Sequence, residues 1–203
     1  DNDTSAEQLW TPSLLLTIGK FMVIFTHDCI IIGVFYMGMQ DINKYSLDAN
    51  SLMLQLTSVG AFVLAYYTAH KVKRRDLIIA QGAASAGIAL LLYFIKAHRL
   101  NDNALIAFAE FVIDYAWFFS VLYFDCIINL FAAETFATNV RALGLSFSCF
   151  AGRMAFAGSP ILISAIVARD MNPLVLAGFS GVAVVGVTMF MEETFNPNMA
   201  VEA

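Results

Sequence analysis

Charged residues are scarce in this sequence: Asp, Glu, Lys and Arg together make up 13% of its 203 residues. Soluble globular domains carry about 25% of these residue types. Hydrophobic residues account for 60% of the chain, and its mean hydropathy is +0.73. So little polar surface excludes an ordinary soluble domain, and we expect an integral membrane protein in contact with a lipid bilayer.

The three cysteines, Cys29, Cys126 and Cys149, are an odd number and lie inside apolar runs without paired spacing. This pattern excludes a disulfide framework and a cysteine-based metal cluster. The sequence also lacks a phosphate-binding loop and a nucleophile–base pair. We therefore expect no enzyme, no cofactor and no nucleic-acid partner.

The sequence begins at Asp1, without a methionine, a basic leading region or a cleavage site. Secretory signal peptides carry those features. We expect the sequence to be an excerpt of a longer chain.

Long apolar runs dominate the rest of the chain. A membrane-spanning helix needs about 20 mainly apolar residues, and six runs meet this requirement: 14–38, 52–69, 77–95, 104–131, 143–167 and 174–191. The runs are continuously apolar over helical lengths, whereas barrel strands alternate in ten-residue pieces. The sequence predicts an all-α membrane protein in which residues 1–203 form a single six-helix transmembrane bundle.

The basic residues of the connections indicate the orientation of the bundle. Four of them lie in one tight turn, 70–75, which reads HKVKRR. Short basic loops stay on the cytoplasmic side of a membrane. We expect this turn, and with it both termini, on the cytoplasmic side.

Ionisable residues inside the apolar runs concentrate on three of the six predicted helices. Lys20 and His27 are seven residues apart, hence about 20° apart around a helix, with Asp28 on an adjoining face. Residues 104–131 place Glu110, Asp114 and Asp125 within about 60° of one another, and residues 143–167 contain Arg153. Charges inside a membrane face protein or water. We expect the first, fourth and fifth helices to meet at a polar cleft, and the third and sixth to face lipid.

The candidate ligands in this cleft are Lys20, His27, Asp28, Asp114 and Arg153. Carboxylates that share a poorly solvated cleft also suit a titratable site for proton-coupled symport. Each candidate has a structural alternative: His27 as a core histidine bonded to backbone or to Asp28, and Asp125 as an ion-pair partner of Lys20. Glu110 fits a position near the outer membrane interface.

Residues 134–160, ETFATNVRALGLSFSCFAGRMAFAGSP, have a distinctive pattern. The motif residues are Glu134, Thr138, Val140, Arg141, Gly144, Arg153 and Pro160. In this order they resemble the start of the fifth helix in the C-terminal half of major facilitator superfamily transporters, closest to the organic-ion branch. Ala137 and Phe136 stand where that branch has proline and tyrosine.

The resemblance extends to the basic turn, where Arg74 and Arg75 match the final pair of the family's D/E-R-x-G-R-R motif. It implies an inward gate, a salt-bridge lattice made by Arg74, Arg75, Glu134, Arg141 and Glu193. The chain departs from the family pattern at His70, Lys73 and Glu192, so we expect a lattice that differs in part from that of the family. The structural alternative is that these charges obey membrane topology and snorkel to the interface.

The resemblance implies that the chain is the C-terminal bundle of a twelve-helix secondary transporter that works by alternating access, with an N-terminal six-helix half as its missing partner. In the organic-ion branch the residue at this position is often acidic in cation carriers and arginine in anion carriers, so with Arg153 the resemblance favours a small organic anion. The planar donors of arginine suit carboxylate or sulfate. The alternative is a non-transporting structural or assembly subunit, derived from a transporter half and docked among partner membrane subunits. In that case we expect Arg153 to be saturated by Asp114 or by a backbone carbonyl.

Overall fold

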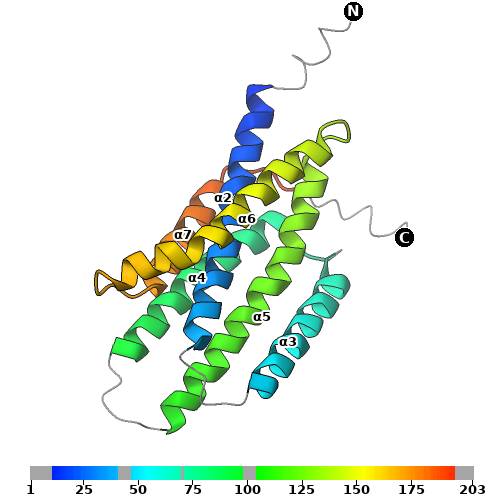
Figure 1. Ribbon diagram of the computed structural model, residues 1–203. Coiled ribbons are helices and arrows are strands. Elements are labelled where there is room, and N and C mark those ends of the chain that lie inside the picture. The colour runs from blue at the N-terminus through cyan, green and yellow to red at the C-terminus, as the bar shows by residue number, and fades with distance from the viewer. Residues whose placement is uncertain (1–10, 41–46, 70, 98–103, 195–203) are drawn as a thin grey trace, which may run out of the picture.

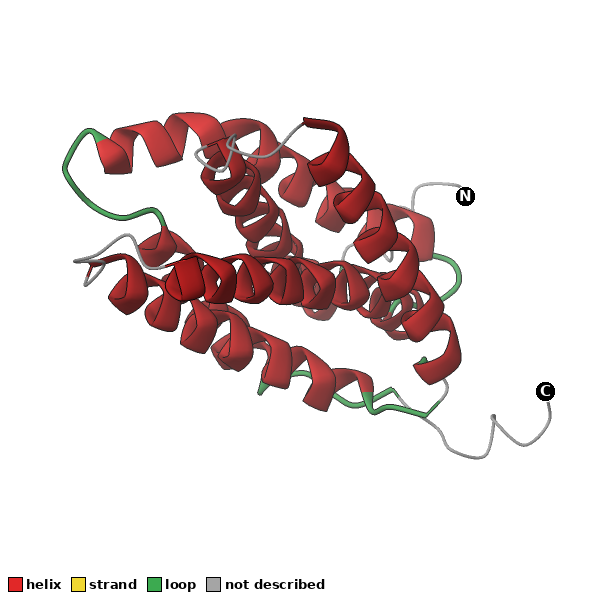
Figure 2. Cartoon of the chain, turned by 90° about the horizontal axis from the view of Figure 1, so that it is seen from below, coloured by secondary structure: helices red, strands yellow, loops and turns green. Residues whose placement is uncertain are grey.

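The computed structural model describes residues 11–40, 47–69, 71–97 and 104–194. Within these ranges the chain forms helices and no strand (Figures 1 and 2). The helices are α2 (Pro12–Gln40), α3 (Leu47–Thr68), α4 (Arg74–Ala97), α5 (Ala104–Thr135), α6 (Arg141–Val167) and α7 (Leu174–Thr188). The prediction of an all-α chain is therefore confirmed, and each predicted apolar run falls on one helix.

Four helices are long and apolar enough to cross a membrane, over the segments Pro12–Phe35, Arg74–Ile95, Phe108–Thr135 and Arg141–Val167. The apolar stretches of α3 and α7, Leu52–Thr68 and Leu174–Thr188, are shorter. The 15 residues of α7 rise about 22 Å, whereas a bilayer core is about 30 Å thick. Four of the six predicted spans therefore have the length and composition of a membrane-crossing helix.

The outer surface of the bundle is apolar. Tyr66 on α3, Ile161 on α6 and Phe179 on α7 are all more than 70% exposed. Soluble monomers rarely leave such large apolar areas in water. This surface and the four long helices are compatible with an integral membrane protein.

The contacts between helices follow an internal exchange pattern. If α2, α3 and α4 are exchanged with α5, α6 and α7, the contact α2–α6 becomes α5–α3, and α2–α7 becomes α5–α4; the contacts α4–α7 and α2–α5 map onto themselves. All of these contacts are present, and only the weak α5–α6 contact lacks a counterpart within the described residues. The two three-helix units therefore occupy equivalent positions in the bundle.

The two units also run in opposite directions. Phe21, near the start of α2, packs against Phe131 and Phe136 at the end of α5, with ring centroids 5.5 and 5.3 Å apart. The start of α2 therefore lies beside the end of α5. Since these helices are the first members of their units, the second unit is inverted relative to the first.

Glycines set the closest helix crossings. Gly82 of α4 and Gly181 of α7 face each other, so that a Cβ on Gly181 would lie 2.6 Å from the Gly82 carbonyl oxygen. On α2, Gly33 leaves room for Ser159 of α6, whose Cβ would lie 2.8 Å from an added Cβ. Small residues let apolar helices approach closely enough for extensive dispersion contacts.

Ser159 needs this space because it repairs a gap in α6. Pro160 lies inside the helix and has no N–H to donate to the carbonyl of Phe156. The Ser159 hydroxyl donates to that carbonyl instead, at 2.8 Å. Pro160 therefore requires the Ser159 hydroxyl, and Ser159 in turn requires the space that Gly33 leaves.

We predict that Gly33→Ala destabilises the bundle, because the new methyl group overlaps Ser159 and forces α2 away from α6. Overpacking costs about 1–3 kcal/mol, which lowers the unfolding midpoint of a chain of this size by roughly 2–12 °C. Thermal unfolding of purified protein, followed by tryptophan fluorescence, measures the change. Gly19→Ala is the matched control, since an added Cβ there meets nothing within 4 Å. Equal midpoints for the two variants would contradict this packing account.

Candidate functional site

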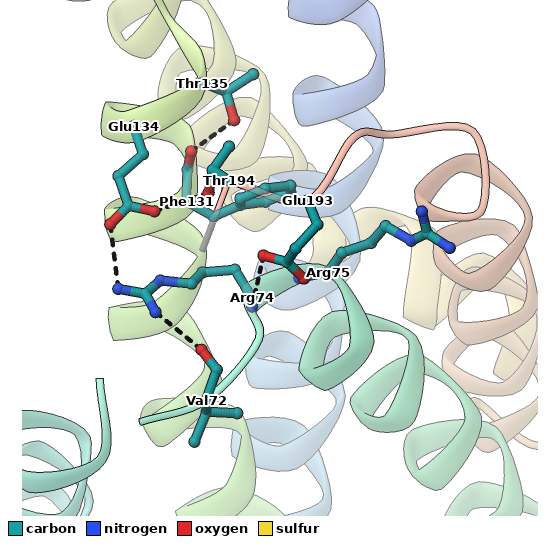
Figure 3. A network of polar contacts seen from close by, with 8 residues as sticks. All are labelled: Val72, Arg74, Arg75, Phe131, Glu134, Thr135, Glu193 and Thr194. Carbon is teal, nitrogen blue, oxygen red and sulfur yellow. Dashed lines mark hydrogen bonds and ion pairs between the residues drawn. The ribbon is translucent and has the colours of Figure 1, made fainter. Parts of the chain in front are cut away.

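Three segments far apart in the sequence meet at one end of the bundle: the start of α4, the end of α5 and the residues that follow α7. Figure 3 shows the polar side chains that they bring together. The residues in contact are Val72, Arg74, Arg75, Glu134, Met191, Glu193 and Thr194, which we call the end cluster.

Glu193 binds the N-terminus of α4. Its Oε1 accepts a hydrogen bond from the backbone N–H of Arg74, and its Oε2 accepts one from the backbone N–H of Arg75, both at 3.1 Å. These donors have no partner inside the helix, and the helix dipole places partial positive charge there. One carboxylate thus caps α4 with both oxygens and fixes the segment after α7 against it.

Arg74 joins this cap to α5. Its guanidinium donates from Nη2 to Glu134 Oε1 at 3.1 Å and from Nη1 to the Val72 carbonyl oxygen at 2.8 Å. The Arg74 side chain is 8% exposed and that of Glu134 is 31% exposed. The second oxygen of Glu134 accepts the Thr194 hydroxyl at 2.7 Å. The Glu134 carboxylate is therefore held by two segments, the start of α4 and the residues after α7.

The sequence prediction that Arg74 or Arg75 pairs with Glu134 is met by Arg74. Arg75 instead donates from Nη1 to the Met191 carbonyl oxygen at 3.3 Å. Arg141 also bonds a carbonyl, because its Nε donates to Phe136 O at 3.3 Å across the short α5–α6 connection. The geometry brings Arg74, Arg75, Glu134 and Glu193 together, and it directs Arg141 to its own turn.

Phe136 explains why Gly144 stands three residues after Arg141. The Phe136 ring is 2% exposed, and a Cβ on Gly144 would lie 2.6 Å from it. The glycine lets the buried ring turn back under the start of α6. Gly144 therefore allows the tight α5–α6 turn that lies between Glu134 and Arg141.

Two of the candidate ligands, Lys20 and His27, face α7. Lys20 Nζ donates to the carbonyl oxygen of Phe190 at 2.7 Å, just beyond the end of α7, where a cation stabilises the unpaired carbonyls. His27 Nδ1 lies 2.8 Å from Ser180 Oγ in the middle of α7. The sequence assigned α7 to lipid because it carries no charge, yet α7 supplies the partners of both residues. His27 thus bonds Ser180, whereas the sequence alternatives gave it backbone or Asp28.

Helices α2, α5 and α6 contact one another, and each carries one of the ionisable residues Asp28, Asp125 and Arg153. Gly152 of α6 packs closely on α2, where a Cβ added to the glycine would lie 3.1 Å from Cys29 Sγ. Asp28 is 2% exposed, and the nearer oxygen of Asp125 accepts a hydrogen bond from Asn129 at 3.1 Å. Among the described residues, no hydrogen bond or ion pair joins Asp28, Asp125 and Arg153 to one another, so the polar cleft of these three helices stays a prediction.

Asp114 and Glu110 lie nearer the start of α5 than Asp125 does. Asp114 is half-buried, and Glu110 is buried with 8% of its surface exposed. Glu110 was expected near a membrane interface, and it lies two turns from the start of α5. Lys20 bonds the Phe190 carbonyl oxygen and Asp125 bonds Asn129, whereas the sequence alternative was an ion pair between Lys20 and Asp125.

Arg153 is exposed on α6. It lies twelve residues after Arg141, about 18 Å along a helix that rises about 40 Å. Within the described part of the chain, its guanidinium has no hydrogen bond or ion pair to Asp114 or to a carbonyl. The arginine is therefore available at mid-height of the bundle.

Several contributing residues had weak sequence signals. Thr194 directly follows Glu193, which the resemblance placed in the gate lattice, so its place beside Glu134 was discoverable. Ser180 had no signal, because a single serine in an apolar helix is common. Across the described ranges, no group of three or more His, Cys, Asp or Glu residues is placed to hold a metal ion.

In comparisons with known proteins, no protein-family model and no curated protein matches this chain.

We predict that Glu193→Gln loosens the first turn of α4, because a neutral amide loses the attraction to the helix dipole and one of its two acceptor oxygens. The expected cost is about 1 kcal/mol. Amide hydrogen exchange at residues 74–78 should then be roughly fivefold faster.

The neighbouring exposed residue Glu192 provides the control for this experiment. Glu192→Gln removes the same charge from the same segment, so it should leave exchange in α4 unchanged. If both variants accelerate exchange equally, general electrostatics rather than the cap holds this turn.

Proposed function

We propose that this chain forms one six-helix bundle of a two-bundle secondary transporter that moves a small organic anion across a membrane by alternating access. The observation that carries the proposal is the exposed Arg153 at mid-height of α6. A charged side chain at that depth is costly against hydrocarbon. It must face a water-filled cleft or another protein surface, and a carrier has both.

The chemistry of Arg153 supports an anionic solute. The guanidinium presents planar donors that bind carboxylate or sulfate in a bidentate manner. Asp28 is buried on α2, and Asp125 accepts a hydrogen bond from Asn129. Among the described residues neither carboxylate is hydrogen-bonded to the Arg153 guanidinium, so its donors are available to a solute.

The helix arrangement supports a transporter bundle as well. Carriers of the major facilitator type are built from pairs of inverted three-helix repeats, with the substrate site near the bilayer midplane. The exchange pattern of the contacts and the inverted orientation of α2 and α5 agree with such repeats. The second bundle would cover the apolar faces of α3 and α6.

In this proposal the end cluster acts as a latch on one side of the membrane. An ion pair at a partly exposed site contributes on the order of 0–1 kcal/mol. A network of such contacts is sufficient to bias an equilibrium between two conformations of similar free energy. Opening of this end would require the Arg74–Glu134 pair and the Glu193 cap to separate or to move together.

A non-transporting assembly subunit derived from such a carrier is the second candidate. It is favoured by the small number of ion pairs in the end cluster. Arg75 and Arg141 bond backbone carbonyls instead of carboxylates. In that case a partner subunit would bind Arg153 permanently.

We predict that substitutions of Arg153 change anion transport without unfolding the bundle. Arg153→Lys keeps the charge but loses the bidentate fork, so the apparent KM for the anion should rise about tenfold. Arg153→Asp should abolish uptake. Vesicles that contain the complete protein, supplied with radiolabelled benzoate and phenyl sulfate as probes, provide the measurement.

Arg169→Asp is the matched control, since it reverses a charge in the exposed α6–α7 connection. It should leave KM unchanged. Uptake that is indifferent to Arg153→Asp would remove the substrate role, and absence of any uptake by the unsubstituted protein would favour the assembly subunit.

A further inference from the structure

The exchange pattern pairs two buried polar contacts with each other. On the α2–α7 side, His27 contacts Ser180, which directly precedes Gly181. On the equivalent α5–α4 side, Ser120 contacts Gln81, which directly precedes Gly82. Because Gly82 and Gly181 form the crossing of α4 and α7, the two polar pairs occupy equivalent places beside it.

The Gln81 pair is closed. Gln81 Nε2 donates to Ser120 Oγ at 2.8 Å, and the Ser120 hydroxyl lies 3.0 Å from Gln81 Oε1. Ser85 adds a further oxygen, 3.4 Å from Gln81 Nε2 and from Trp117 Nε1. None of these side chains leaves a buried polar atom without a partner. This side of the bundle is a structural polar contact.

The His27 pair is open. The Ser180 hydroxyl donates to the Ala177 carbonyl oxygen at 3.0 Å, so its oxygen accepts from His27 Nδ1 at 2.8 Å. In the neutral ring this assigns the proton to Nδ1 and leaves Nε2 as an acceptor. His27 is 1% exposed, and its Nε2 has no hydrogen-bond partner among the described residues. A buried acceptor left in this way costs about 1–3 kcal/mol.

A cavity of about 250 Å³ borders this pair. Besides His27 and Ser180, it is lined by Met22, Val23, Thr26, Ala151 and Ala183. α6 and α7 both pack on α2, but within the described residues they do not contact each other, which leaves the space between them. Figure 1 shows these three helices.

The lining restricts the chemistry of an occupant. The cavity is open on one side, and its lining combines the apolar residues Met22, Val23, Ala151 and Ala183, which favour an apolar guest, with the acceptor on His27. The volume is below the roughly 300–1,000 Å³ of pockets for drug-sized ligands. A carboxylate offers no proton to Nε2, and an ammonium group would enter an apolar site with its charge uncompensated.

We propose that this cavity binds a small uncharged amphiphile with an apolar chain and one hydroxyl group, which donates its hydrogen bond to His27 Nε2. The site is separate from Arg153 and does not depend on transport. The hydroxyl group of the ligand would satisfy His27 Nε2, a buried acceptor without a partner. The equivalent Gln81 pair has no such atom. The inverted repeats have therefore diverged into a closed structural contact on one side and a ligand site on the other.

Photolabelling of the full chain in lipid nanodiscs tests this proposal. The probe is octanol that carries a diazirine, and the competitors are unlabelled octanol and octane. We expect labels on the peptides that contain Met22 or Ala151, and we expect octanol to compete about fivefold better than octane because it alone supplies the donor. Equal competition by the two, or no labelling of these peptides, would overturn the proposal.

Substitutions of His27 identify the acceptor. His27→Gln retains a side-chain acceptor and should keep the preference for octanol over octane, whereas His27→Phe should abolish it. Ser120→Ala alters the equivalent closed pair and should leave the preference unchanged. A preference that survives His27→Phe in protein that still elutes as a folded species would contradict the assignment. If His27→Phe does not fold, the comparison of octanol with octane on the unsubstituted chain decides the outcome.

Discussion

The binding of one carboxylate to one helix N-terminus organises the charged end of this bundle. Glu193 accepts the backbone N–H groups of Arg74 and Arg75, and so it holds the segment after α7 against the start of α4. That position sets Thr194 beside Glu134 and lets the Arg74 guanidinium reach the same carboxylate. In a chain with 13% charged residues, most of the packing is apolar and non-directional. The end cluster supplies the directional contacts that fix the helix ends.

Outside the end cluster, close apolar packing and a few interhelical hydrogen bonds specify the bundle. Gly82 and Gly181 allow α4 and α7 to cross closely, and Gly33 accommodates the serine that compensates for Pro160. Lipid offers the outer side chains an environment as apolar as the core, so close packing and interhelical hydrogen bonds drive association. The polar pairs beside the glycine crossing provide such bonds. The Gln81–Ser120 pair is fully hydrogen-bonded, whereas the His27–Ser180 pair leaves Nε2 without a partner. In our proposal this difference makes the α2–α7 side the ligand site.

Part of this arrangement was predictable from the sequence. Continuous apolar runs predicted the helices, and the resemblance of the segments around Arg74, Glu134 and Glu193 to a transporter family implied that these residues meet. The direction of Lys20 and His27 was not predictable. Their seven-residue spacing shows that they share a face of α2, but the neighbour of that face depends on tertiary packing, which placed α7 there. Arg141 followed local geometry, since a carbonyl five residues earlier in its own turn was closer at hand than a distant carboxylate.

The central claim is that the face of α6 carrying Arg153 borders water inside the membrane. Ala157, one turn further along that face, is exposed, and Val182 on α7 is exposed with 63% of its surface accessible. In a chain whose native cysteines are replaced by serine, Ala157→Cys and Val182→Cys can be treated with a membrane-impermeant thiol reagent in native membranes. The account predicts rapid labelling at position 157 and none at position 182, because lipid covers α7. Labelling at 182 with none at 157 would contradict it.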